Sequence, residues 1–183
     1  MLGSNRQKSD FLSKLRKLWK NETVRTLLLM GLVVIIVLFF RTILIAALGT
    51  EYPLHTPISP SMEPTLNIGD LLIVQGVNGL DEINADHENG DIIVFQKPNN
   101  PNDFVVHRAV EKSKMSGDIP FLVTKGDNNP SEDPWKVKEE NLIGKVVWRI
   151  PLLGYIKIFL GTPVGMAITI IVFLLLIFLE RAK

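Results

Sequence analysis

Two segments of this chain carry residue types that together perform nucleophilic catalysis. Ser61 lies in Ser59-Pro60-Ser61-Met62-Glu63-Pro64-Thr65-Leu66, and His107 lies in the strand-like run Phe104-Val105-Val106-His107-Arg108-Ala109-Val110. A neutral imidazole can take the proton of a serine hydroxyl near neutral pH, because histidine has a reference pKa of about 6.5. The two residues therefore predict a serine nucleophile with a histidine base.

Each of these residues also has a simpler structural interpretation. A serine between prolines is typical of an ordinary loop, and a histidine in an apolar run is typical of a half-buried strand end. Pro60 fixes its own φ and Pro64 restricts Glu63, so the backbone around the serine is stiff. That stiffness suits a nucleophile whose amide must point at an oxyanion, and it equally suits a turn. The other histidines, His55 and His87, lie in polar, loop-like surroundings and give no comparable signal.

Two aspartates compete as the acid that would orient the imidazole. Asp127 lies in Lys125-Gly126-Asp127-Asn128-Asn129, and Asp133 follows six residues later in the same predicted loop. Aspartate is common in turns, so chemistry alone leaves both as candidates. The chain order Ser, His, Asp differs from that of chymotrypsin-like enzymes and subtilisins, and the Gly-x-Ser-x-Gly elbow of α/β-hydrolases is missing.

The segments that must position these residues read as short strands. Apolar, β-branched runs bounded by Gly, Pro, Asn and Asp occur at 71–74, 92–95, 104–110, 121–124 and 142–150. This pattern predicts a mainly β domain, either a pair of antiparallel sheets or a partly closed barrel. Residues 78–90 read as a surface excursion.

Two long apolar segments flank this domain. Leu27–Leu48 is apolar apart from Arg41 and Thr42, and a helix of this length spans about 33 Å, enough for a bilayer core of about 30 Å. A second run, Ile158–Leu179, is interrupted by Gly161, Thr162, Pro163 and Gly165. Arg41 can snorkel toward the interface or pair with an acidic group on a neighbouring helix.

The predicted organisation has five parts. A basic cytoplasmic N-terminus (1–25) precedes a transmembrane helix (26–49), an extracytoplasmic β-rich domain (50–157), a second transmembrane helix (158–179) and a cytoplasmic tail (180–183). The Lys and Arg residues ahead of the first span set this orientation. The alternative is a cleaved signal peptide with Ala47-Leu48-Gly49 as its site, but its apolar stretch is much longer than the 7–15 residues usual there.

Composition excludes several other chemistries. The 183-residue chain has no cysteine, so a disulfide framework, a thiolate metal site and a cysteine nucleophile are excluded. Its three histidines lack metal-ligand spacing, and its net charge is +1 with no basic tract interleaved with aromatics. We therefore expect no metal, no cofactor and no nucleic acid.

Four boxes in a fixed order point to a known family. The serine box at 59–66, Gly90-Asp91-Ile92-Ile93-Val94-Phe95, Val106-His107-Arg108 and Lys125-Gly126-Asp127-Asn128-Asn129 cover most of residues 59–133. In this order they resemble the type I signal peptidases (peptidase S26 family). The similarity is to the branch of the endoplasmic reticulum, archaea and some spore-forming bacteria, which uses histidine where other bacterial enzymes have lysine.

The resemblance implies a fold and a set of roles. It implies a β-rich domain of two antiparallel sheets, with Ser61 as nucleophile and His107 as general base. Asp133 would be the triad acid, although the proline after it departs from the family pattern, and Asp127 would support the site through hydrogen bonds. The Ser59 hydroxyl and the Ser61 amide would form the oxyanion hole. From the same resemblance we expect shallow substrate pockets lined by Ile58 and Met62.

The resemblance also implies an activity and a location. The expected function is a membrane-bound serine endopeptidase that removes signal peptides from translocated preproteins at small-x-small sites. Its partners would be secretory preproteins, the lipid bilayer and other membrane subunits. It would lie in the cell membrane as a multi-pass protein with its catalytic domain outside, or in the endoplasmic reticulum membrane of a eukaryote. The alternatives are a non-catalytic, membrane-anchored precursor-binding subunit, or a peptidase of the same fold with narrower substrates.

Overall fold

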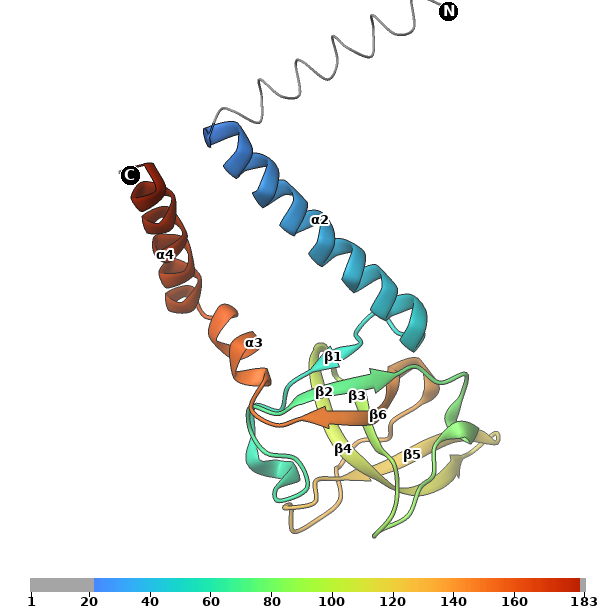
Figure 1. Cartoon of the computed structure of the whole chain (residues 1–183). Coiled ribbons are helices and arrows are strands. Elements are labelled where there is room, and N and C mark those ends of the chain that lie inside the picture. Colours follow the sequence, from blue (N-terminus) through green and yellow to red (C-terminus); the bar gives the residue numbers. More distant parts are fainter. Residues whose placement is uncertain (1–21, 182–183) are drawn as a thin grey trace, which may run out of the picture. The chain divides into compact units, whose positions relative to one another are not determined.

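The computed structural model describes residues 22–181 (Figure 1). The described chain divides into two compact units, one formed by Leu44–Val172 and the other by residues 22–43 with 173–181. Most of the predicted basic N-terminus (1–25) lies outside the described residues, as do residues 182–183 of the predicted tail.

The first apolar segment forms one long helix. Helix α2 covers Glu22–Leu48, and its 25 residues from Val24 to Leu48 form a candidate membrane span with a mean hydropathy of 2.9. Apolar side chains are exposed all around it, a pattern typical of helices in lipid. Within the described part of the chain, α2 is the one unbroken helix long and apolar enough to cross a membrane. This agrees with the predicted span at 26–49.

The second apolar segment differs from the transmembrane helix predicted at 158–179. Helix α3 covers Gly154–Leu160, helix α4 covers Pro163–Arg181, and the two are bent by 89° at the break between them. Pro163 explains the break, because its ring disfavours a helical conformation at Thr162 and it has no N–H for the helix. Neither α3 nor α4 qualifies by itself as a membrane span.

The domain between the helices is built on one antiparallel sheet (Figure 1). The strand order is β1-β2-β6-β3-β4-β5 and each neighbouring pair is antiparallel. The strands are β1 (Leu54–His55), β2 (Leu71–Gln75), β3 (Ile92–Lys97), β4 (Asn100–Met115), β5 (Ile119–Lys125) and β6 (Leu142–Ile150). The prediction of a mainly β, antiparallel domain is confirmed, and its strands form one six-stranded sheet instead of the alternative pair of sheets.

The register of the central strands sets the position of His107. In the β3–β4 hairpin Ile93 pairs with His107, and in the next hairpin Arg108 pairs with Lys125, the last residue of β5. A bulge follows between Ala109 and Glu111. His107 therefore lies beside the end of β5, where the loop with the two candidate aspartates begins.

Two clusters of buried apolar residues pack on the strands. The first core cluster contains Leu80, Ile83, Ile93, Phe95, Ala109, Leu122 and Val137, and the second contains Met62, Leu66 and Leu72. On β4, Val105 packs against the first cluster and Val106 against the second, as alternation along a strand requires. The predicted surface excursion at 78–90 is wrong in part, because the 3-10 helix η2 (Leu80–Glu82) and the residue after it bury Leu80 and Ile83.

Candidate active site

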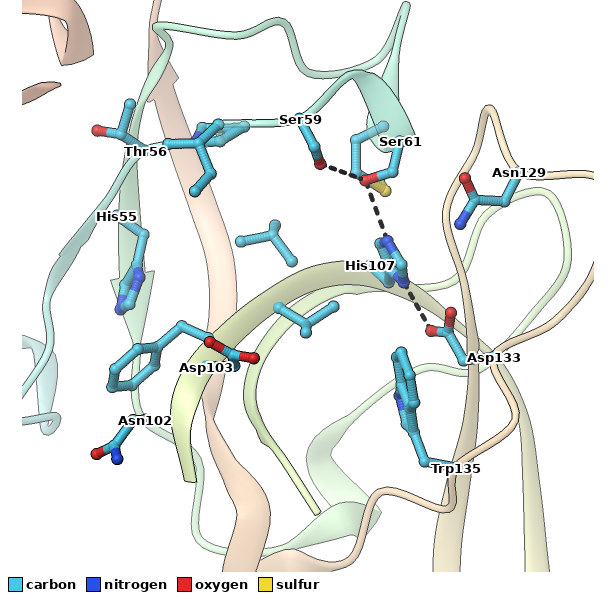
Figure 2. Close-up of a pocket in the computed structure, with 16 residues that line it drawn as sticks. His55, Thr56, Ser59, Ser61, Asn102, Asp103, His107, Asn129, Asp133 and Trp135 are labelled. Carbon is cyan, nitrogen blue, oxygen red and sulfur yellow. Dashed lines mark hydrogen bonds and ion pairs between the residues drawn. The ribbon is translucent and has the colours of Figure 1, made fainter. Parts of the chain in front are cut away.

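The serine box folds into a short turn held by the core. The 3-10 helix η1 covers Pro60–Met62, and we call it the nucleophile turn. Proline at the first helical position has a φ already suited to the helix and lacks an N–H that would have no partner there. Met62 is only 1% exposed in the second core cluster, so it anchors the turn. Ser61, one residue earlier, faces the cleft shown in Figure 2.

Ser61, His107 and Asp133 form a continuous hydrogen-bonded line (Figure 2). His107 Nε2 lies 3.1 Å from Ser61 Oγ, and His107 Nδ1 lies 2.6 Å from Asp133 Oδ2. The side chains of His107 and Asp133 are only 8% and 6% exposed. A carboxylate on Nδ1 favours the tautomer with the proton on Nδ1, which leaves Nε2 free to accept the serine proton.

Asp133 is fixed by the end of strand β5. The Thr124 hydroxyl donates to Asp133 Oδ2 over 2.6 Å, and the Asp133 amide donates to the Thr124 carbonyl over 2.8 Å. Thr124 itself is fully buried. Pro134 restricts the backbone of the residue before it to extended conformations. These contacts fix the Asp133 carboxylate at a buried position, where its Oδ2 contacts both His107 Nδ1 and the Thr124 hydroxyl.

Asp127 lies apart from His107 and pairs with Arg108. Arg108 Nε and Nη2 donate to the two Asp127 carboxylate oxygens over 2.8 and 2.6 Å, and Nη1 donates to the Gly90 carbonyl over 2.7 Å. Burial raises the pKa of Asp127, but hydrogen bonds from Arg108 and Thr65 and the charge of Arg108 outweigh it, so that pKa lies below its usual value. Because neighbouring strand residues point to opposite faces, His107 and Arg108 contact different aspartates.

The hydrogen-bonded line from Ser61 to Asp133 opens into a cleft of about 560 Å³. Residues 55–59, Ser61, Met62 and the strand segment 102–107 line it, together with Asn129, Asp133 and Trp135. Ser59 Oγ lies at 3.1 Å from Ser61 Oγ (Figure 2). Ile58 is 81% exposed at this cleft, whereas Met62 contributes from a buried position. The structure thus brings together the nucleophile, base, oxyanion and substrate-binding residues predicted from sequence.

Sequence reasoning overlooked His55, which lies on the cleft wall. It is 9% exposed, its Nε2 has no hydrogen-bond partner, and its ring lies 5.3 Å from that of Phe104. Burial, together with the nearby Lys157 ammonium, lowers the pKa of His55 to about 4, although a hydrogen bond to the Tyr52 backbone raises it slightly. The expectation of a polar, loop-like setting is therefore wrong: the ring is buried, and it is neutral near pH 7.

Sequence reasoning also assigned no role to the asparagines of the last box. We call residues 126–129 the Gly126 loop. The Asn128 amide donates to the Ser61 carbonyl over 2.9 Å, and Asn128 Nδ2 donates to the Pro60 carbonyl over 3.1 Å. A Cβ added to Gly126 would lie 2.6 Å from the Ser61 carbonyl oxygen, so glycine permits this close approach. The order Gly-Asp-Asn-Asn was the available signal, but no local pattern shows what a loop contacts.

Within residues 22–181, no group of three or more His, Asp or Glu side chains is arranged to hold a metal ion.

Comparisons with known proteins agree with this geometry. The family model described as "Signal peptidase, peptidase S26" matches residues 23–111. The signal peptidase complex catalytic subunit SEC11C of Canis lupus familiaris is 33% identical over 160 residues, which cover 83% of this chain and 80% of the relative. The human SEC11C is 32% identical over the same shares. Signal peptidase I W of Bacillus subtilis is 37% identical over 91 residues, covering 50% of this chain and 44% of that protein.

The family-model match runs through the serine box and the histidine strand, which the fold brings to one cleft. The canine SEC11C alignment, at 33% identity over 80% of that protein, shows the family. The chain belongs to the signal peptidase family, peptidase S26.

Proposed function

We propose that this chain is a membrane-bound serine endopeptidase that removes N-terminal signal peptides from translocated preproteins at small-x-small sites. The observation that carries the proposal is the line from Ser61 through His107 to Asp133, with contacts of 3.1 and 2.6 Å, in a chain of the signal peptidase family. No cofactor is needed, because nucleophile, base and acid all come from side chains.

In the first step His107 is the general base. Its Nε2 takes the Ser61 hydroxyl proton as Oγ attacks the scissile carbonyl carbon, and the imidazolium that forms is stabilised by Asp133. His107 then returns the proton to the leaving amine. Water, activated by the same imidazole, hydrolyses the acyl-enzyme and releases Ser61. Asp127 takes no part in these proton transfers; we propose that its pair with Arg108 holds the Gly126 loop in place.

The oxyanion hole is assigned to the Ser61 amide and the Ser59 hydroxyl. In the free enzyme the Ser59 and Ser61 hydroxyl oxygens lie 3.1 Å apart. A hydroxyl rotates freely, so Ser59 can turn its proton to an oxyanion once substrate occupies the cleft. Donors arranged in advance around a developing charge give large rate effects, since they need no reorganisation during the reaction.

The cleft suits an extended peptide with small side chains. The segment 55–59 forms one wall and the start of β4 forms another, with Ile58 and Met62 as apolar lining. Twelve residues separate Gly49, just after α2, from Ser61, which limits their separation to about 40 Å. A nucleophile tethered this closely to a span lies near the bilayer surface, where a translocated precursor presents its cleavage site.

We further propose the membrane arrangement predicted from sequence, with residues 50–157 outside and residues 158–179 as a second crossing. The basic residues before α2 and the apolar composition of α4 support it. The cell membrane is the proposed location, or the endoplasmic reticulum membrane if the source is eukaryotic. Because the SEC11C relatives are named as catalytic subunits of a signal peptidase complex, other membrane subunits are proposed partners.

The test is cleavage of a model preprotein with an Ala-x-Ala site by the detergent-purified chain, beside its Ser61→Ala variant. Cleavage at that site by the parent alone would support the proposal. Cleavage by both proteins would assign the activity to a contaminant and contradict a Ser61 nucleophile. If neither protein cleaves, even after reconstitution in lipid, the precursor-binding alternative takes its place.

A further inference from the structure

Hydrogen bonds to its carbonyl oxygen hold the peptide group between Pro60 and Ser61 in place. Its carbonyl oxygen accepts two hydrogen bonds, one from Asn128 Nδ2 over 3.1 Å and one from the Glu63 amide over 3.1 Å. The Asn128 amide also donates to the next carbonyl, that of Ser61, over 2.9 Å. One residue of the Gly126 loop therefore contacts two successive peptide groups of the nucleophile turn.

The N–H of this same peptide group is the proposed oxyanion donor. A peptide group is planar, and in its trans form the C=O and N–H point in opposite directions. A hydrogen bond that draws the Pro60 carbonyl toward Asn128 therefore turns the Ser61 N–H away from the Gly126 loop. In Figure 2 this loop, marked by Asn129, lies on one side of Ser61 and Ser59 lies on the other. The Ser61 N–H is thus directed to the side of the second donor.

Two further observations fit this arrangement. Ser61 lies in the first turn of η1, where a backbone N–H has no acceptor within the helix, so its N–H can donate to a ligand. Hydrogen bonds polarise one another, so donors on the Pro60 carbonyl make the N–H of the same group a better donor. Without Asn128, the Glu63 amide would be the remaining donor to that carbonyl and the peptide plane would be free to rock.

We propose that Asn128 is a positioning residue for the oxyanion hole, because its side-chain amide fixes the Pro60–Ser61 peptide plane and so the direction of the Ser61 N–H. This inference rests on the proposed function, and it adds a group outside the catalytic line that controls stabilisation of the transition state. Asn128 does not touch the substrate, and its effect passes through the backbone of the nucleophile.

The experiment compares the parent with Asn128→Asp, Asn128→Ala and the control Asn99→Asp. Asp has the shape of Asn but cannot donate to the Pro60 carbonyl when ionised. Asn99 is exposed in the turn between β3 and β4, so its substitution makes the same change of charge away from the cleft. Steady-state kinetics on a preprotein are measured with two inhibitors, a substrate-like peptide aldehyde and the corresponding peptide amide. Thermal unfolding is recorded for each variant.

The aldehyde reports on the oxyanion hole, since it reacts with the enzyme without being cleaved. Ser61 Oγ bonds to the aldehyde carbon, the carbonyl π electrons move to its oxygen, and the serine proton passes to His107. The peptide amide binds the same cleft without forming that bond. A loss confined to the aldehyde therefore identifies damage to the oxyanion hole and not to peptide binding.

We expect both Asn128 variants to lower kcat about tenfold to a hundredfold, below the hundred- to thousandfold typical of deleting a donor outright. KM should stay within about twofold, aldehyde affinity should fall in parallel with kcat/KM, and amide affinity should not change. Asn99→Asp should match the parent. Unchanged kcat, or equal losses for aldehyde and amide, would overturn the inference. If the parent itself cleaves no preprotein, the proposed function fails instead, so the two failures are distinguishable.

Discussion

The two aspartates near the cleft give a sharp test, because the structure assigns them different contacts. Asp133 Oδ2 lies 2.6 Å from His107 Nδ1, whereas Asp127 accepts hydrogen bonds from Arg108 Nε and Nη2. Replacing each aspartate with asparagine keeps its shape and removes its charge. We expect Asp133→Asn to lose most of the activity and Asp127→Asn to keep most of it.

The size of the difference follows from the imidazolium formed during the reaction. With charge centres about 4 Å apart and an effective dielectric constant of about 20, its attraction to Asp133 is about 4 kcal/mol. Losing that attraction raises the barrier by a similar amount, which corresponds to about a thousandfold in kcat. Asp127 contacts Arg108 and not the imidazole, so Asp127→Asn should lower kcat less than tenfold. It should mainly reduce thermal stability, because a largely buried guanidinium loses its charged partner.

The assay is the initial rate of preprotein cleavage in detergent, measured below the unfolding temperature of both variants. Circular dichroism at that temperature confirms that each variant is folded. A thousandfold loss in Asp127→Asn beside a near-normal Asp133→Asn would refute the reasoning. Equal losses in both variants would also contradict it, because they would mean that the carboxylates act as one structural unit.

Three further outcomes can be checked in the same system. Ser59→Ala should lower kcat about a hundredfold while Ser61→Ala abolishes cleavage, and equal, mild losses in rate assays would contradict the oxyanion assignment. Burial lowers the pKa of His55 from 6.5 to about 4, so between these pH values the unfolded chain binds more protons than the folded chain. The free energy of unfolding should therefore fall by about 3 kcal/mol as the pH drops from 6.5 to 4. Chemical unfolding should show this pH dependence in the parent and not in His55→Phe. Gly126→Ala would place a Cβ 2.6 Å from the Ser61 carbonyl oxygen and should lower kcat at least tenfold. A kcat equal to that of the parent would contradict this, because it would show that the loop can accept the Cβ without displacing Ser61.

Local patterns in the sequence were enough to predict several strands, the first helix and two of the site residues of this protein. The β-branched runs predicted the strands, and β6 has the predicted bounds at 142–150, while β4 extends further on both sides of Phe104–Val110. Twenty-two nearly uninterrupted apolar residues predicted α2. The family boxes indicated Ser61 and His107 because each carries its signal within a few neighbouring residues. These features depend on side-chain type and spacing, which a sequence records directly.

Tertiary structure decided which distant groups meet. Asp127 and Asp133 lie in one loop, and nothing local separates them, because both are acidic turn residues. The pairing of β4 with β5 places Thr124 and the loop after it beside His107, while strand alternation turns Arg108 to the opposite face. The guanidinium binds Asp127, and the imidazole contacts Asp133. Register and alternation are properties of paired strands, so residue type and spacing left both carboxylates open. The family resemblance favoured Asp133, and the folded chain shows that this carboxylate is the one that contacts His107.

The same reason explains the residues that sequence analysis overlooked. The short strand β1 and the rings of Tyr52 and Phe104 determine the burial of His55. The two hydrogen bonds from Asn128 reach the carbonyls of Ser61 and Pro60, which lie 67 and 68 residues earlier in the sequence. A sequence shows that a chain has the side chains for a reaction. The orientation of a single peptide N–H depends on a hydrogen bond between distant loops, and only the tertiary structure determines that orientation.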